Sequence, residues 1–122
     1  MEEKKGADHK KGLILMIYTD LLVSIWKKTV VILGAVTVNA LLEASIHHIG
    51  KIYSFLKDME FDYDGIYPER IKYEEVSTDE IKKGFTALIT NLFEEISELA
   101  GRSMAEQIKK EMERAHLPGG EE

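Results

Sequence analysis

The chain has 122 residues, a formal net charge of −6, 44% hydrophobic residues and no cysteine. This length suits one compact domain, and Leu, Ile, Val and Phe are too abundant for a disordered chain. The lack of cysteine excludes disulfide scaffolds, thiolate metal centres and a cysteine nucleophile. The acidic balance argues against a broad nucleic-acid surface, which needs basic residues to displace the counterions of phosphate.

The charge is distributed unevenly along the chain. The first 60 residues are nearly neutral, whereas residues 61–122 hold the acidic excess and alternate charged with apolar residues. Amide side chains are few, and Glu and Lys dominate the charged residues. Thermophile proteins show this depletion of labile side chains and this enrichment in Lys and Glu, so we expect a thermophilic source.

The N-terminal segment does not resemble a targeting signal. Residues 1–12 mix charges and glycine without apolar periodicity, which predicts a disordered arm. The short apolar run that follows lacks a small-residue cleavage site. The longest uncharged run, residues 29–42, is shorter than the about 20 residues that span a bilayer. We therefore expect a cytoplasmic protein with no membrane span.

Residues 13–28 predict the first helix. Apolar residues recur every four positions in two neighbouring stripes, so this helix is buried on more than one side. Residues 29–33 either continue it or turn into the second helix, and Gly34 is the predicted break. The two stripes consist of Leu13, Ile17, Leu21 and Ile25, and of Ile14, Tyr18, Leu22 and Trp26.

Residues 35–56 predict a second helix, the central element of the fold. Its apolar positions fall on one face at three- and four-residue steps. The small residues Ala40 and Ala44 lie beside that face and permit close approach of another helix. The face consists of Val38, Leu41, Leu42, Ser45, Ile49, Ile52 and Leu56.

Residues 57–76 interrupt the helical pattern. Asp64-Gly65 and Pro68 form turns, and four aromatic residues alternate with acids and bases. Two interpretations stay open: a short hairpin between residues 61–63 and 71–73, or an irregular aromatic loop that covers one end of the bundle.

Two capping boxes mark the last helices. Ser77 and Glu80 start a third helix that runs to Leu99 and ends at Gly101. Its predicted inward positions are Ile81, Phe85, Leu88, Leu92, Ile96 and Leu99.

Ser103 and Glu106 form the second box and start a fourth helix that ends near Ala115. Its thin apolar stripe is Met104, Ile108 and Met112. The prediction is an all-α, four-helix bundle-like domain over residues 13–116, with an aromatic-rich loop between the second and third helices. Residues 117–122 are expected to be a flexible tail.

The sequence carries no recognisable catalytic set. Its serines lack a nucleophile elbow, and its glycines lack a phosphate-loop context. Glu43 and His47 are one helical turn apart, a spacing that can hold a metal ion, but no third ligand accompanies them. We therefore predict no catalytic residues, no metal site and no cofactor.

The fragment from His48 to Lys51 resembles the H-x-x-K core of histidine phosphotransfer domains, which are four-helix bundles. The resemblance covers four residues, and Ile52 replaces the glycine usual after the lysine. It implies that His48 accepts a phosphate that Lys51 steadies.

The excess of apolar residues between Leu13 and Leu56 indicates a partner. Either the second helix is central within the protomer, or a second copy covers the remaining apolar surface. We expect a homodimer or a helical protein partner, and a non-catalytic interaction or regulatory module such as a signalling accessory or an assembly adaptor. The predicted interface comprises Val38, Leu41, Ile49, Met104, Ile108 and Met112.

The alternative is a sensor that binds a small molecule or cofactor between helices. His47 or His48 then contacts the ligand, and Trp26 and Phe85 form the pocket wall. Glu43 and Lys51 complete the set of candidate ligand or phosphate residues.

Overall fold

A computed structural model of the chain describes residues 2–101, 106 and 110. These residues form three α-helices, two short 3₁₀ helices and one two-stranded antiparallel sheet. In chain order they are α1 (Glu2–Leu33), α2 (Ala35–Ile49), η1 (Ser54–Asp58), β1 (Glu60–Phe61), β2 (Ile66–Tyr67), η2 (Pro68–Arg70) and α3 (Thr78–Ala100).

The predicted helical character is confirmed, with the addition of a small sheet. The prediction of a four-helix bundle is not supported, because residues 2–101 contain three α-helices. The predicted fourth helix and the tail lie outside the part of the chain that the structure describes, apart from Glu106 and Lys110.

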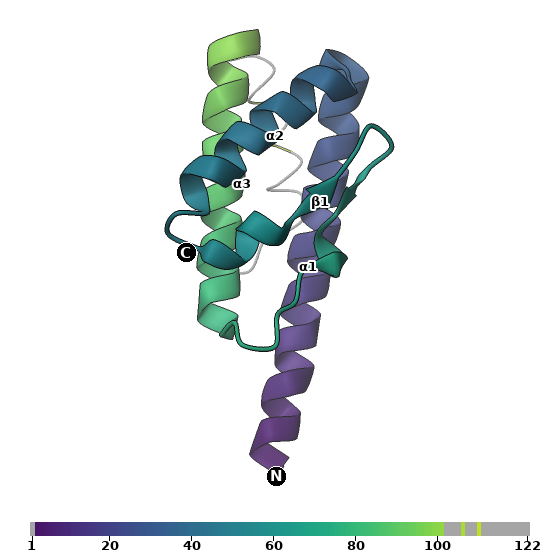
Figure 1. The fold of residues 1–122 in the computed structure, drawn as a ribbon. Coiled ribbons are helices and arrows are strands. Elements are labelled where there is room, and N and C mark those ends of the chain that lie inside the picture. The colour runs from purple at the N-terminus through teal and green to yellow at the C-terminus, as the bar shows by residue number, and fades with distance from the viewer. Residues whose placement is uncertain (1, 102–105, 107–109, 111–122) are drawn as a thin grey trace.

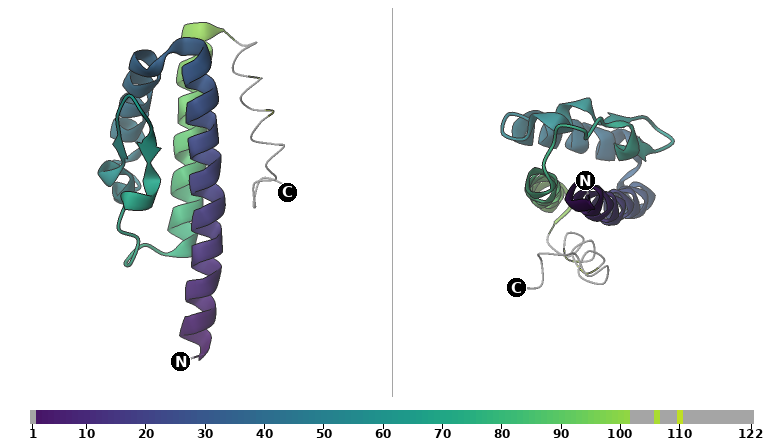
Figure 2. Two further views of the ribbon diagram at one scale, coloured as in Figure 1. Left: turned by 90° about the vertical axis from the view of Figure 1, so that its right-hand side faces the viewer. Right: turned by 90° about the horizontal axis from the view of Figure 1, so that it is seen from below.

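The elements pack in two layers (Figures 1 and 2). Helices α1 and α3 lie side by side and run in the same direction. Helix α2 starts at the end where α1 finishes and crosses back over this pair. Together with η1 and the hairpin it forms the second layer.

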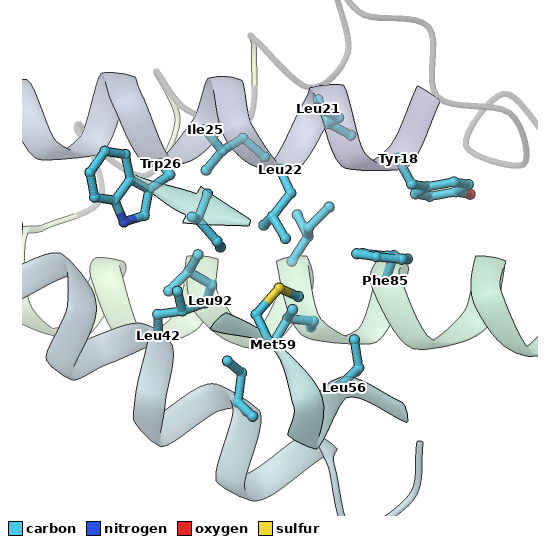
Figure 3. Packing of buried hydrophobic residues seen from close by; sticks show 14 of the residues in the cluster. Tyr18, Leu21, Leu22, Ile25, Trp26, Leu42, Leu56, Met59, Phe85 and Leu92 are labelled. Carbon is cyan, nitrogen blue, oxygen red and sulfur yellow. The ribbon is translucent and has the colours of Figure 1, made fainter. Parts of the chain in front are cut away.

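The core fills the space between the layers (Figure 3). The rings of Tyr18 and Phe85 stack with centroids 5.8 Å apart, and Phe55 meets Phe85 edge-on at 5.9 Å. Helix α3 contributes Ile81, Phe85, Leu88, Ile89, Leu92 and Ile96, each at most 2% exposed. The inward-facing stripe predicted for this helix is thus correct except for Leu99, which is 58% exposed at its last turn.

Helix α1 begins at Glu2 and passes through the segment predicted to be a disordered arm. A helix that is already formed extends at little cost, since each added residue contributes a hydrogen bond without a new nucleus. Lys11 also donates to the carbonyl oxygen of Tyr73, which ties this part of α1 to the chain before α3. Residues 29–33 continue α1, and Gly34, at a φ of 87°, ends it as predicted.

Helix α2 ends at Ile49, seven residues before the predicted Leu56. At Gly50 the chain turns so tightly that a Cβ atom would lie 2.5 Å from the carbonyl oxygen of Ile46. The turn leaves Ile52 70% exposed and returns the chain as η1, where Phe55 and Leu56 enter the core.

The hairpin exists, but its strands differ from those predicted. Glu60 pairs with Tyr67, and Phe61 with Ile66. The carboxylate of Asp62 closes the loop because its Oδ1 accepts the backbone N–H groups of Asp64 and Gly65 at 2.9 and 3.0 Å. This local turn is tighter than a connection that reaches residues 71–73.

The start and end of α3 follow the prediction. Ser77 Oγ accepts the backbone N–H of Glu80 at 3.1 Å, and the Ser77 N–H donates to Glu80 Oε1 at 3.5 Å. The helix ends at Ala100, and Gly101 follows with a φ of 96°. The capping box at Ser77 is therefore confirmed.

Candidate functional site

The candidate ligand residues lie on the outer side of α2. Glu43 and His47 are exposed and stand one helical turn apart. Because Ala40 and Ala44 are small, an open hollow of about 570 Å³ forms between α2 and α3. His48 on α2 and Asn91 and Glu95 on α3 complete its lining.

A second hollow, of about 460 Å³, lies on the other side of Glu43 and His47. Lys51 and Lys57 line this hollow, whereas His48 lines the first one. The two residues that carry the H-x-x-K resemblance therefore line different hollows. Phosphate transfer through His48 stays a prediction.

The first hollow, between α2 and α3, offers hydrogen-bond acceptors to a ligand. The carboxylates of Glu43 and Glu95 line it, and Asn91 Oδ1 is buried without a hydrogen-bond partner. Among the residues that the structure describes, no three His, Asp or Glu side chains are grouped so that they could hold a metal ion.

The predicted sensor pocket is filled by side chains. Trp26 is 6% exposed and donates its indole N–H to Asn39, while Phe85 is fully buried against Tyr18 and Phe55. Both aromatic residues thus contribute to the core and do not line a ligand cavity with His47 or His48.

Of the three predicted interface residues that the structure describes, two belong to the core. Val38 is 1% and Ile49 8% exposed within the protomer, so neither offers surface to a partner. Leu41 is partly buried and packs against the core. Met104, Ile108 and Met112 lie outside the described residues.

One exposed apolar surface lies on α1. Leu13, Met16 and Ile17 are 46%, 56% and 39% exposed, and their spacing places them within about one turn of the helix. We call these three residues the α1 apolar cluster. Leu13 and Ile17 belong to the first predicted stripe, but the spacing does not reveal that the protomer buries only the second half of that stripe, Leu21 and Ile25.

A further group of exposed apolar residues lies where the helices end. Val31, Ile32 and Val36 flank the break at Gly34, and they are 85%, 46% and 68% exposed. Leu99 lies in the last turn of α3.

Comparison with protein-family models, curated proteins and solved structures finds no match for this chain. Within the described residues, no helix is long and apolar enough to cross a membrane.

The charged side chains of the hairpin interact with one another and with the hairpin backbone. Hydrogen bonds from the Asp64 N–H, the Tyr67 hydroxyl and the Gly65 N–H lower the pKa of Asp62. The hydrogen bond that the Tyr67 hydroxyl donates to Asp62 also raises the pKa of Tyr67. The Arg70 guanidinium lies 4.1 Å from the centroid of the Tyr67 ring and pairs with Glu60 at 3.0 Å. These exposed contacts stabilise the hairpin, and Asp62 also lines a third hollow, of about 380 Å³, between α2 and the hairpin.

Proposed function

We propose that the protein is a non-catalytic helical interaction module that binds its partner through the α1 apolar cluster. One observation carries the proposal: three large apolar side chains within about one turn of a helix are each more than a third exposed. Water contact with such side chains costs about 25 cal/mol per Å², and a partner that covers them removes this cost. Successive apolar positions on a helix are a common means of docking.

The cluster is held rigidly, which favours binding. On the other side of the same helical turns, Ile14 and Tyr18 are 6% and 1% exposed, so the core fixes the rotation of α1. Lys11 fixes the helix again through the carbonyl oxygen of Tyr73. A preorganised surface loses little conformational freedom when it binds.

In this role the protein binds its partner and catalyses no reaction. A cytoplasmic signalling accessory or assembly adaptor acts by presenting a helix face, in the manner proposed for α1. The partner is a second copy of the chain or another helical protein.

The absence of cysteine from the sequence permits a direct test. A Met16→Cys variant is labelled with a photo-crosslinker and irradiated in an extract of the source cells. We expect one discrete adduct, either with the same chain or with another protein. The matched control is Ile52→Cys, because Ile52 is also apolar and 70% exposed but lies on the turn after α2. Equal labelling from both positions, or no adduct from position 16, contradicts the proposed docking face.

A further inference from the structure

We infer that the partner on this face is a second copy of the chain, with its α1 antiparallel to the first about a twofold axis near residue 15. This inference rests on the proposed function, since it names the occupant of the α1 apolar cluster. Charged and apolar residues follow a particular order along one exposed stripe of α1.

Two opposite charges flank the cluster at equal distances. Lys10 precedes Leu13 by three residues, and Asp20 follows Ile17 by three residues. All four side chains are exposed. Steps of three, four and three residues keep positions 10, 13, 17 and 20 on one face of a helix.

The spacing of these four residues is symmetric about residue 15. The two inner positions are both apolar, and the two outer positions carry opposite charges. A twofold contact requires a surface that is complementary to itself. When two such helices lie antiparallel, Lys10 of each copy meets Asp20 of the partner copy. Leu13 of each copy then meets Ile17 of the partner copy.

Other arrangements of the two helices match less well. A parallel pair sets Lys10 against Lys10 of the partner copy and Asp20 against Asp20 of the partner copy. An antiparallel pair centred between residues 16 and 17 places Leu13 opposite Asp20 of the partner copy, which removes a carboxylate from water without a cation. The register about residue 15 places apolar residues opposite apolar residues and each charged residue opposite one of the other sign.

The charged positions are available for this pairing. In the part of the chain that the structure describes, neither Lys10 nor Asp20 takes part in a salt bridge. An exposed ion pair contributes little binding free energy, so the two pairs select the register while the apolar cluster supplies most of the affinity.

Charge reversal tests the register directly. In an Asp20→Lys homodimer, both ion pairs become Lys–Lys contacts, and in a Lys10→Asp homodimer both become Asp–Asp contacts. We expect the dissociation constant, measured by sedimentation equilibrium, to rise roughly tenfold in each single variant. We expect the double variant Lys10→Asp/Asp20→Lys to recover the wild-type constant.

Mixing the two single variants provides the sharpest result. In the mixed dimer both ion pairs are attractive, so the heterodimer should form in preference to either homodimer. A higher salt concentration should reduce the differences in dissociation constant among these variants, because salt screens exposed charges. Helical circular dichroism of each variant checks that the protomer is still folded.

The apolar positions have their own variants. Leu13→Ser/Ile17→Ser should dissociate the dimer into folded protomers, whereas Ile52→Ser should leave it intact. A wild-type chain that is monomeric at every concentration overturns the inference, as does an Asp20→Lys variant that dimerises like the wild type. If the chain is monomeric but the Met16→Cys variant still crosslinks to another protein, self-pairing fails and the proposed docking face survives. If the wild-type chain is monomeric and the Met16→Cys variant gives no adduct, both the self-pairing and the docking face are wrong.

Discussion

The indole N–H of Trp26 donates a 2.8 Å hydrogen bond to Asn39 Oδ1, and Asn39 Nδ2 donates in turn to the carbonyl oxygen of Asp62 at 2.8 Å. Trp26 and Asn39 are only 6% and 8% exposed. One side-chain amide therefore joins α1, α2 and the loop of the hairpin. A buried polar network with satisfied partners specifies one arrangement of its elements, because a shift leaves polar groups without partners.

The first prediction concerns this bridge. Asn39→Ala leaves the Trp26 N–H and the Asp62 carbonyl without their partner, and we expect the free energy of unfolding to fall by about 2 kcal/mol. Urea unfolding followed by circular dichroism measures the loss. A double-mutant cycle with Trp26→Phe isolates the hydrogen bond from the lost volume. Additive effects of the two substitutions contradict the role of the bridge.

The second prediction compares two glycines within helices. A Cβ atom at Gly84 would lie 2.7 Å from the ring of Phe55, which also packs against Phe85 and Tyr73. We expect Gly84→Ala to destabilise the protein by about 1–3 kcal/mol, although alanine favours helices. Gly12 has no atom within 4 Å of such a Cβ. Gly12→Ala should therefore stabilise the protein by about 0.5–1 kcal/mol.

Thermal unfolding of the two variants measures this contrast. Equal stabilisation by both substitutions shows that the Phe55 ring moves aside without cost. Equal destabilisation shows that α1 is strained at Gly12.

Local signals predicted the parts of the fold that depend on neighbours in sequence. The break at Gly34 and the capping box at Ser77 each need only a few residues, and both are confirmed. The end of α2 was predicted too late, since apolar spacing continues through Ile52 and Leu56. The helix nevertheless ends at Ile49, and the N–H groups of Ile52 and Tyr53 both donate to the carbonyl oxygen of Ile49 in the turn that follows. Apolar spacing carries no signal for this turn.

The candidate site shows the same division. Glu43 and His47 share a face, as their four-residue spacing predicts, and the structure places both on two hollows. Val38 and Ile49 were predicted to meet a partner, but α2 packs them into the protomer's own core. Apolarity alone does not distinguish an internal contact from an external one. The packing of α2 against α1 and α3 makes that distinction.

The third prediction concerns the start of α3. Ser77 Oγ accepts an N–H of the first helical turn that otherwise has no partner within the helix. Ser77→Ala should lower the free energy of unfolding by about 1 kcal/mol. The matched control is Thr90→Ala, because Thr90 is exposed in the middle of the same helix and alanine is the better helix former. We expect that variant to be slightly stabilised in the same urea titration, and a similar loss in both variants excludes a capping role for Ser77.

The last prediction is a pH dependence in the hairpin. Hydrogen bonds from the Asp64 N–H, the Tyr67 hydroxyl and the Gly65 N–H favour the ionised carboxylate of Asp62, so its pKa lies below the ordinary value of 3.8. A lowered pKa in the folded state means that ionised Asp62 stabilises the hairpin above the ordinary value. This stabilisation is lost as the pH falls through the lowered pKa. An NMR titration of the side-chain carboxyl carbon should place its midpoint below 3.8.

Tyr67→Phe separates the contributions to this shift. It removes the hydroxyl donor but keeps both backbone donors, so the midpoint of Asp62 should rise and still lie below the ordinary value. Asp62→Asn removes the titrating group, and the acid-dependent change in the Gly65 amide signal should disappear with it. A wild-type midpoint at or above 3.8 contradicts the hydrogen bonds that close the hairpin loop, because bonds donated to this carboxyl group favour its ionised form.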